Sequence, residues 1–261
     1  MTYQTILKQA ADGAVATIAL NRPETANALN RRMAEELAEA VQSAGRDKDI
    51  RVIILTGAGE KAFCAGADLK ERSGMTEAEW HEQHSAFERA VAAILTCPKP
   101  VIAAMNGAAF GGGLELAMAC DFIYAADGAA MGLTEARLGI MPGMGGTQFL
   151  PRAVGSRRAK EMLFTAARIT AAEAEKIGLV NRVFPAASLM DKTLATARAI
   201  AGNAPLSVIA IKRAVAEGKD APLASAMQTE LHYYHTLLTT QDREEGINAF
   251  NDKRPPRFTG S

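Results

Sequence analysis

The sequence has few cysteines, no net charge and no long apolar run. Its three cysteines, Cys64, Cys97 and Cys120, lie far apart without paired spacing, which is typical of reduced thiols and argues against disulfides or a zinc site. The 29 basic residues balance 29 acidic ones, so no overall field attracts nucleic acid or an anionic membrane. No apolar run approaches bilayer-spanning length, and the first residues lack a secretory pattern. We expect a cytoplasmic protein that binds neither nucleic acid nor membrane.

Several common site motifs are also missing. The sequence contains no G-K-[ST] phosphate loop and no G-x-S-x-G nucleophile elbow. Residues 57–62 fit the dinucleotide-binding pattern loosely, but a second glycine turn follows them instead of an amphipathic helix. The histidines form two pairs at one-turn spacing, His81 with His84 and His232 with His235, and neither pair has a third ligand nearby. We expect no nucleotide site and no metal site.

Apolar patterning predicts strands and helices over the first two thirds of the chain and helices over the rest. Asp12-Gly13 lies between two apolar runs as a hairpin signal, and Thr76 with Glu79 and Thr170 with Glu173 have capping-box spacing. We expect strands at residues 3–8, 15–20, 52–56, 101–105, 122–125 and 180–183. We expect helices at residues 30–43, 76–95 and from 189 onward, and a loop at 60–72 that leads into a short helix.

This order of elements predicts the α/β fold class. Residues 1–190 are expected to form the core that carries the site. Residues 191–261 are expected to form a helical region that packs on a neighbouring subunit. The sequence contains no internal repeat and no low-complexity linker.

The stretch from Lys99 to Glu115 organises the rest of the chain. An apolar run breaks at Asn106-Gly107, passes through three glycines at residues 111–113, and enters a helical pattern with Glu115 in its first turn. Glycine allows close backbone approach, and the free N–H groups of a helix N-terminus favour negative charge. The stretch therefore predicts an anion-stabilising turn. The alternative is that the glycines only let the helix pack tightly on its strand.

Two glutamates are candidate acid–base groups. Glu115 lies in an otherwise apolar helix, whereas Glu135 follows Thr134 and is also compatible with an ordinary acid in the first turn of a capped helix. Two carboxylates that face one water can divide the roles of general base and general acid. The sequence leaves open whether these two face each other.

Three motifs, in this order, resemble the enoyl-CoA hydratase/isomerase (crotonase) family. They are FCAGADLK at residues 63–70, NGAAFGGGLELA at 106–117, and Glu135 followed by PGMGGT at 142–147. The similarity extends from the N-terminal hairpin to the closing residues 253–256. It implies a crotonase-type repeated ββα spiral core with a C-terminal helical oligomerisation region, assembled as a homotrimer or a dimer of trimers.

The resemblance also implies a reaction. The backbone N–H groups of Ala67 and Gly112 are expected to form an oxyanion hole for a thioester carbonyl. The presence of both Glu115 and Glu135 favours a hydratase, in which water between the carboxylates adds to C3 of a 2-trans-enoyl-CoA and Glu135 delivers a proton to C2. Three alternatives stay open: 3-methylglutaconyl-CoA hydration, double-bond isomerisation, and a non-catalytic acyl-CoA-binding subunit.

The substrate contacts implied by the family are less specific. Coenzyme A is part of the substrate, and no separate cofactor is implied. The pocket for the acyl tail is expected from loops and from residues 73–90. The residues expected near coenzyme A are Ala65, Ala67, Asp68, Leu69, Lys70, Phe250 and Lys253. For Lys253 and its basic neighbours a solvated tail is the alternative.

Two departures from the common pattern matter. Phe149 stands where many relatives carry arginine. The ADLKER segment and the KRPPR ending also resemble 3-methylglutaconyl-CoA hydratases, a branch that includes a protein binding AU-rich RNA through a lysine-rich first helix. Here the corresponding helix carries Glu35, Glu36 and Glu39, so we do not expect RNA binding.

Overall fold

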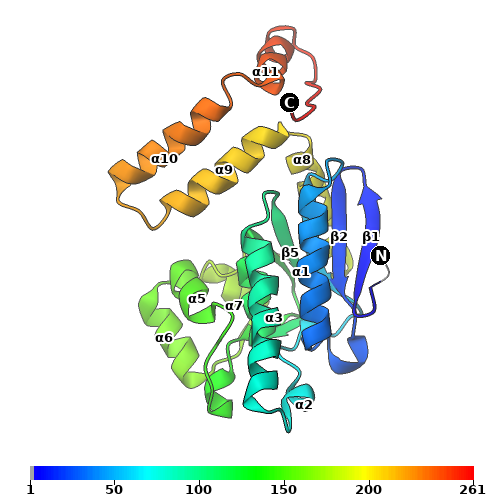
Figure 1. Ribbon diagram of the computed structural model, residues 1–261, viewed down its shortest axis with the longest axis vertical. Coiled ribbons are helices and arrows are strands. Elements are labelled where there is room, and N and C mark those ends of the chain that lie inside the picture. Colours follow the sequence, from blue (N-terminus) through cyan, green and yellow to red (C-terminus); the bar gives the residue numbers. More distant parts are fainter. Residues whose placement is uncertain (1–2) are drawn as a thin grey trace.

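The computed structural model describes residues 3–261, apart from the side chains of residues 10–12. Within this range the strands form two sheets (Figure 1). The larger sheet contains, in spatial order, β1 (Ile6–Asp12), β2 (Val15–Leu20), β3 (Val52–Gly57), β5 (Val101–Met105), β7 (Phe122–Ala126) and β10 (Arg182–Phe184). The smaller sheet contains β4 (Ala62–Cys64), β6 (Ala108–Phe110), β8 (Ala130–Gly132) and β9 (Ile169–Thr170).

The helices cover these sheets and continue into the C-terminal region. Those that follow the strands of the core are α1 (Arg31–Arg46), α2 (Leu69–Arg72), α3 (Glu77–Leu95), α4 (Gly112–Ala119), α5 (Gly146–Val154), α6 (Ser156–Thr165) and α7 (Ala171–Lys176). Those of the C-terminal part are α8 (Leu189–Ala201), α9 (Pro205–Gly218), α10 (Leu223–Thr236) and α11 (Gln241–Asn251). Single 3₁₀ turns lie at Pro23–Thr25, at Glu135–Leu138 (η2) and at Ala186–Ser188.

The chain winds through the two sheets in repeated ββα units. β3, β5 and β7 each add a parallel strand to the larger sheet. The strand that follows each of them, β4, β6 or β8, adds a parallel strand to the smaller sheet. Helices then follow: α2 and α3 after β4, α4 after β6, and η2 and α5 after β8. The expected α/β class and the repeated ββα arrangement are both confirmed.

The larger sheet is buried on both faces, which explains the continuous apolar runs of its central strands. Along β3, Ile53 and Leu55 face a cluster that includes the inner sides of α1 and α3, whereas Val52 and Ile54 face a second cluster that includes α8. Figure 1 shows α1 and α3 on one side of the sheet and α8 behind it. Successive side chains of β3 therefore enter different cores, and both cores are mostly apolar.

Several local signals in the sequence are confirmed. Asp12 and Val15 close the antiparallel hairpin of β1 and β2. The capping box of α3 forms in full, because the Thr76 hydroxyl accepts from the N–H of Glu79 while the Glu79 carboxylate accepts from the N–H of Thr76. The same reciprocal pair begins α7. Such bonds satisfy amide groups that would otherwise lack partners at a helix start.

Other local predictions need correction. Residues 60–72 are not only a loop and a short helix, because Ala62–Cys64 form β4. A strand of three residues is too short to show the alternation by which strands are recognised. The last strand lies at Arg182–Phe184 instead of residues 180–183. Among the described helices no single one is long and apolar enough to cross a bilayer, although Ala186–Ala201 and Pro205–Gly218, bent by 104°, reach that length and composition together.

The C-terminal helices α9–α11 and the tail after them form an arm that projects from the core (Figure 1). α8 packs on the larger sheet through Leu189 and Ala197, so one helix of the expected C-terminal region lies on the core. The Arg51 guanidinium donates to the carbonyls of Ala201, at 2.9 Å, and Phe258, at 2.6 Å. Arg51 thereby links the end of α8, just before the arm, to the tail that ends the arm.

The position of α4 depends on the missing side chain of Gly113. A Cβ atom at residue 113 would lie 2.1 Å from the carbonyl oxygen of Cys64, which is backbone and cannot rotate away. We expect Gly113→Ala to lower the free energy of unfolding by roughly 1–3 kcal/mol through overpacking, despite the higher helix propensity of alanine. Chemical denaturation measures this change. Gly128→Ala is the control, because a Cβ there meets no atom within 4 Å; equal stability of both variants would contradict this account of α4.

Candidate active site

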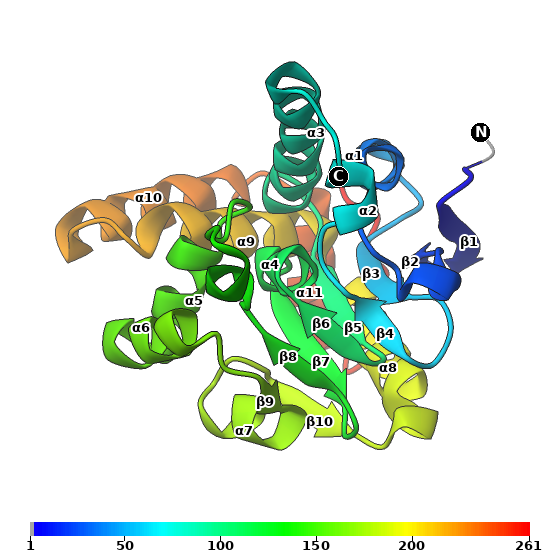
Figure 2. The same cartoon turned by 90° about the horizontal axis from the view of Figure 1, so that it is seen from below.

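Three parallel strands of the smaller sheet bring the predicted site residues together. β4, β6 and β8 are neighbours, so their carboxyl ends lie at the same edge (Figure 2). Ala67 follows β4, Gly112 begins α4 directly after β6, and Glu135 begins η2 after β8. The parallel pairing thus gathers residues from separate parts of the sequence. It supplies the spatial relation between the motifs that the sequence leaves open.

Ala67 and Gly112 lie close together, and within the described residues neither N–H group donates a backbone hydrogen bond. Ala67 bridges to Leu29, but the bonds of that bridge use the carbonyl of Gly66 and the N–H of Asp68. Gly112 is the first residue of α4, where the N–H has no acceptor within the helix. A Cβ at Gly112 would lie 3.8 Å from the Ala67 nitrogen. The two amides can therefore bind one oxygen that gains negative charge.

Glu115 is buried in the first turn of α4 and held by the following glycine loop. Its Oε1 accepts from the N–H groups of Met144, at 2.8 Å, and Gly146, at 2.7 Å. A Cβ at Gly146 would lie 3.0 Å from this oxygen. Burial raises the pKa of Glu115, and these backbone donors oppose the rise. One carboxylate oxygen is fixed in this way.

Glu135 is also buried, with only 8% of its surface exposed, but its carboxylate has fewer hydrogen-bond donors than that of Glu115. Its Oε2 has no hydrogen-bond partner within residues 3–261. Burial raises its pKa to about 7; its own backbone N–H opposes the rise and the charge of Glu115 adds to it. A Cβ at Gly111 would lie 3.0 Å from Oε1 of Glu135, so only glycine leaves this space. Glu135 can hold or release a proton near neutral pH.

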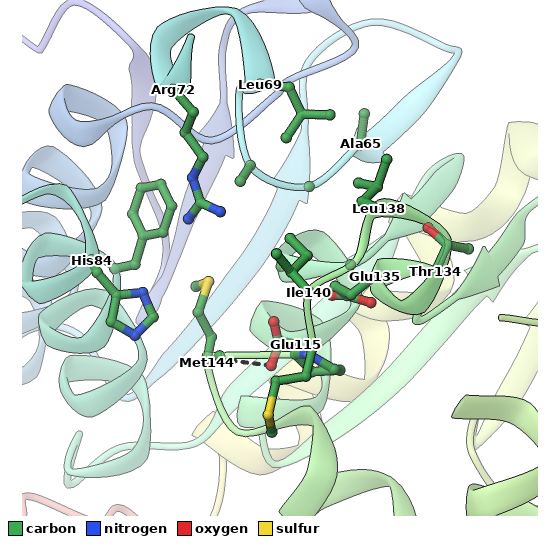
Figure 3. Close-up of a pocket in the computed structure, with 18 of the residues that line it drawn as sticks. Ala65, Leu69, Arg72, His84, Glu115, Thr134, Glu135, Leu138, Ile140 and Met144 are labelled. Carbon is green, nitrogen blue, oxygen red and sulfur yellow. Dashed lines mark hydrogen bonds between the residues drawn. The ribbon is translucent and has the colours of Figure 1, made fainter. Parts of the chain in front are cut away.

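Both carboxylates face a single cavity of ≈ 480 Å³ (Figure 3). Backbone from the ends of β4 and β6 forms one wall, and largely apolar side chains from α2, α3 and the loop after η2 form the rest. The residues that line it are Ala65, Gly66, Ala67, Leu69, Arg72, Trp80, His84, Phe87, Gly111, Gly112, Glu115, Thr134, Glu135, Leu138, Ile140, Met141, Pro142, Gly143 and Met144. A largely apolar cavity with a few converging polar groups is typical of an enzyme active site.

Of the two roles considered for the glycines at 111–113, the packing role is confirmed and the functional role stays a prediction. Gly113 allows α4 to pack on β4, as the purely structural alternative requires. Gly112 lines the cavity together with Ala67, which is compatible with the functional alternative. Glu135 begins η2, but the Thr134 side chain makes no capping hydrogen bond there. The expected cap by the Thr134 side chain is therefore wrong, whereas Glu135 does lie in the first turn of η2 as an acid.

Several wall residues do not appear among the predicted site residues. α3 contributes Trp80, His84 and Phe87 at helical spacing, within the region expected for a tail pocket. The imidazole of His84 stacks on the Trp80 ring, with ring centroids 4.8 Å apart. Arg72 ends α2 and directs its guanidinium into the cavity (Figure 3). The helical spacing is visible in the sequence, but nothing there shows that Arg72 turns inward.

The residues predicted to contact coenzyme A do not all lie at the cavity. Ala65, Ala67 and Leu69 line it, whereas Asp68 caps α2 and forms an ion pair with Arg22 at 2.9 Å. Lys70 is not a lining residue. The remaining two predicted residues, Phe250 and Lys253, belong to the arm, which lies at the opposite end of the long axis from α2 (Figure 1). Phe250 is 83% exposed.

The basic ending is only partly a solvated tail. Arg254 pairs with Glu245 at 2.8 Å, and the backbone N–H of Arg257 donates to the same carboxylate. Lys253 has positive φ, at 54°, and its side chain makes no hydrogen bond or ion pair within residues 3–261.

Phe149 packs its ring over Gly145, which has φ of 109°. This contact lies in the loop that donates to Glu115, so Phe149 has a local packing role there.

The cysteines and the candidate metal ligands of the sequence do not form a site within the described residues. Cys64 is fully buried, and burial raises its pKa to about 11, as for an unreactive packed thiol. All three cysteines are free. Among the described residues, no three histidine, cysteine, aspartate or glutamate side chains are placed to hold a metal ion.

Comparison with known proteins gives a consistent result. The family model described as enoyl-CoA hydratase/isomerase matches residues 10–261. The Bacillus subtilis protein named "Putative enoyl-CoA hydratase/isomerase YngF" is 46% identical over 94% of this chain and 95% of its own length. The human protein named enoyl-CoA hydratase domain-containing protein 2, mitochondrial, is 42% identical over 95% of this chain and 87% of its own. A crystal structure of enoyl-CoA hydratase from Bacillus anthracis superposes with a TM-score of 0.97 at 45% identity and covers 99% of this chain and 100% of that one.

The raised pKa of Glu135 predicts a pH-dependent cost in stability. In the unfolded chain the carboxyl group ionises near its ordinary value of 4.5, but in the folded chain it ionises near about 7. The protonated Glu135 carboxyl group therefore contributes fully to the free energy of unfolding below the pKa of the unfolded chain. This contribution is lost as pH rises through the pKa of the folded chain. The difference corresponds to roughly 3 kcal/mol as an upper limit. We expect Glu135→Gln to gain stability relative to the unsubstituted protein between about pH 5 and about pH 8.

Denaturant unfolding at both pH values measures this gain. Glu161→Gln is the matched control, since Glu161 is exposed on α6. If Glu135→Gln and the unsubstituted protein show the same pH dependence, Glu135 does not carry the proposed buried charge.

Proposed function

Because the chain belongs to the enoyl-CoA hydratase/isomerase family, we propose that it is an enoyl-CoA hydratase, which adds water to a 2-trans-enoyl-CoA to give a 3-hydroxyacyl-CoA. One observation carries this proposal: Glu115 and Glu135 both face a cavity that is also lined by Ala67 and Gly112, whose amides we take as the oxyanion hole. A thioester oxygen on the amides would place C2 and C3 beside the two acids. Family members of related activity share the fold, so the assignment of hydration rests on the pair of glutamates.

The two amides act on charge that develops during the reaction. When a water oxygen bonds to C3, the electrons of the double bond move toward the thioester, whose oxygen becomes an enolate. The N–H groups of Ala67 and Gly112 stabilise that oxygen more strongly than the neutral carbonyl. One such donor contributes roughly 2.7–4 kcal/mol to lowering a barrier of this kind. The groups are fixed by backbone, so little reorganisation is needed.

The environments of the two acids suggest different roles. Glu115 has one oxygen fixed by backbone donors that favour its ionised form, so it accepts the proton of the attacking water. Glu135, with its pKa near about 7, is available in protonated form and donates a proton to C2. A proton that returns from Glu115 to Glu135 through water restores both groups. The net change is the addition of one water molecule.

The arm suggests an assembly of several copies. On α10, Leu223, Met227, Leu231 and Tyr234 form an exposed stripe at helical spacing. Exposed apolar patches of this kind mark protein interfaces. We propose that the stripe packs on another copy, as a homotrimer or a dimer of trimers. Because Phe250 lies far from the cavity of its own chain, we propose that it and Lys253 reach coenzyme A bound to a neighbouring copy.

We also propose a cellular location for the enzyme and an absence of certain partners and cofactors. The free, buried cysteines support a reducing, cytoplasmic location. The balanced charge supports an enzyme with no nucleic-acid or membrane partner. Coenzyme A arrives as part of the substrate, and the mechanism uses no separate cofactor or metal.

Hydration through the two acids is tested by the loss of enoyl absorbance when the protein meets crotonyl-CoA. We expect Glu135→Gln and Glu115→Gln each to lower kcat by roughly 10²–10⁴-fold, because each removes a positioned acid–base group. Glu161→Gln is expected to retain full activity. Titration calorimetry with a saturated acyl-CoA checks that the two site variants still bind.

Other results of these assays would indicate a different activity. Full activity in both site variants would contradict the proposed acid–base roles. Turnover of a 3-enoyl-CoA in preference to the 2-enoyl isomer would indicate an isomerase, and preference for 3-methylglutaconyl-CoA would indicate that hydratase activity. Binding without turnover of any of these substrates would leave a non-catalytic acyl-CoA-binding subunit.

The oligomeric state is tested by sedimentation equilibrium. We expect a particle of three or six times the 27.6 kDa chain mass. Met227→Glu is expected to shift it toward the single chain, because the charge would be buried at the apolar contact. Gln228→Glu, one residue away and also exposed, is expected to leave the assembly intact. A monomeric unsubstituted protein would contradict the proposed packing.

A further inference from the structure

His84 lines the cavity and has a buried polar atom without a partner. Among the described residues, two buried side-chain nitrogen or oxygen atoms have no hydrogen bond: Nδ1 of His84 and Oε2 of Glu135. Both residues line the same cavity, and Figure 3 shows them on opposite sides of it, with Glu115 between them. The proposed acid role accounts for Glu135 but not for His84. Buried polar atoms are almost always hydrogen-bonded, so an exception in a binding cavity indicates a ligand group that pairs with it.

The imidazole ring of His84 is held from two sides. It stacks on the Trp80 ring with an angle of 11° between the ring planes. A Cβ at Gly143 would lie 2.8 Å from Cε1 and 3.8 Å from Nδ1 of the imidazole, so the backbone of the glycine loop packs against this edge. The next residue of that loop, Met144, donates to Glu115. The position of Nδ1 is therefore fixed by the same loop that holds a proposed catalytic acid.

The other ring nitrogen of His84 faces a carboxylate. Nε2 lies 3.6 Å from Oε1 of Glu88, which is one turn along α3 and mostly exposed. This negative charge favours a proton on Nε2, so Nδ1 of the neutral imidazole is a hydrogen-bond acceptor. A proton on both nitrogens would make Nδ1 a donor instead. A hydroxyl group suits either case, because it can both donate and accept.

The surroundings of His84 do not supply this partner. Nε of Arg72 donates to Oε1 of the buried Gln83 at 2.9 Å, and the guanidinium carbon lies 5.6 Å from the centroid of the Phe87 ring. Trp80 and Phe87 present largely apolar rings on the same helix as His84. A buried water typically makes about three hydrogen bonds to unpaired polar groups, whereas Nδ1 is the one such buried atom on this side of the described cavity. This leaves the bound substrate as the source of the partner.

We propose that the substrate is a 2-enoyl thioester whose acyl chain ends in a hydroxyl group, and that this hydroxyl binds Nδ1 of His84. The thioester lies at Ala67 and Gly112, and the far end of the chain lies against α3. An alkyl end would leave Nδ1 covered and unpaired, which weakens binding. His84 is thus a specificity-determining residue and takes no part in the proton transfers. This inference rests on the proposed function, because it specifies the acyl group of the same site.

Binding of saturated thioesters tests the hydroxyl site without any turnover. 6-Hydroxyhexanoyl-CoA and 7-hydroxyheptanoyl-CoA have alkyl counterparts in heptanoyl-CoA and octanoyl-CoA, in which a methyl group replaces the hydroxyl. We expect at least one hydroxyacyl thioester to bind roughly 3–10-fold tighter than its counterpart in titration calorimetry, the range expected for a hydrogen bond between neutral groups.

Variants of His84 locate the hydroxyl. His84→Phe keeps a ring and removes both nitrogens, so we expect it to lose the preference while still binding the alkyl thioesters. His84→Asn places an amide near the position of Nδ1 and should keep the preference in part, whereas His84→Gln places its amide nearer to Nε2 and should lose it. The control is His81→Phe, which changes an exposed histidine of α3 that does not line the cavity and should keep the full preference.

Two results would overturn the proposal. One is that the unsubstituted protein prefers neither hydroxyacyl thioester, since water would then satisfy Nδ1 whatever the variants do. The other is a preference that survives in His84→Phe, since the hydroxyl would then bind elsewhere. Crotonyl-CoA has no hydroxyl group and its hydration is measured separately, so failure of this inference can be distinguished from failure of the proposed function.

Discussion

The close approach of α4 to the end of β4 is the constraint on which the site depends. Gly113 has no side chain to separate the helix from the Cys64 carbonyl, so the first turn of α4 lies directly beside the loop that contains Ala67. That approach places the free amide of Gly112 next to the amide of Ala67. It also places Glu115, three residues into the helix, at the wall of the cavity. A helix displaced by the width of a methyl group would separate these amides.

The two buried acids differ because the backbone around them differs. Glu115 faces a glycine loop that presents N–H groups, and the loop keeps its shape partly through the packing of Phe149 on Gly145. Glu135 follows a strand end and has no equivalent donors for Oε2. Two identical side chains thus acquire different proton affinities from their positions alone. The difference allows one to accept a proton while the other donates one.

Most of the fold could be predicted from local patterns. The strands at residues 15–20 and 52–56 are buried apolar runs, and the helix at 76–95 begins with a capping box, so these elements could be predicted without structural information. β4, β6 and β8 were not, because three residues carry no periodicity. These short strands are the elements that align the motifs in space. The identities of Glu115, Glu135 and Gly112 could therefore be predicted, but their mutual arrangement could not.

The inward direction of Arg72 follows from a tertiary contact and was also invisible in the sequence. Its partner Gln83 is eleven residues away and lies on a different helix, so no short motif records the pair. Local patterns in ADLKER show only the Asp68 cap and a turn of helix. Functional side chains positioned by contacts between elements are in general harder to recognise than those in a glycine turn.

The residues of α2 and α3 that line the cavity and those proposed to carry out the reaction lie on separate elements. Arg72, Trp80 and Phe87 belong to α2 and α3, whereas Glu115 and Glu135 belong to α4 and η2. In evolutionary terms, the preference of such an enzyme can diverge through substitutions along one surface of α3 while its acids and oxyanion amides are inherited unchanged. A designer can use the same separation by exchanging residues 69–87 as a cassette within an otherwise constant scaffold.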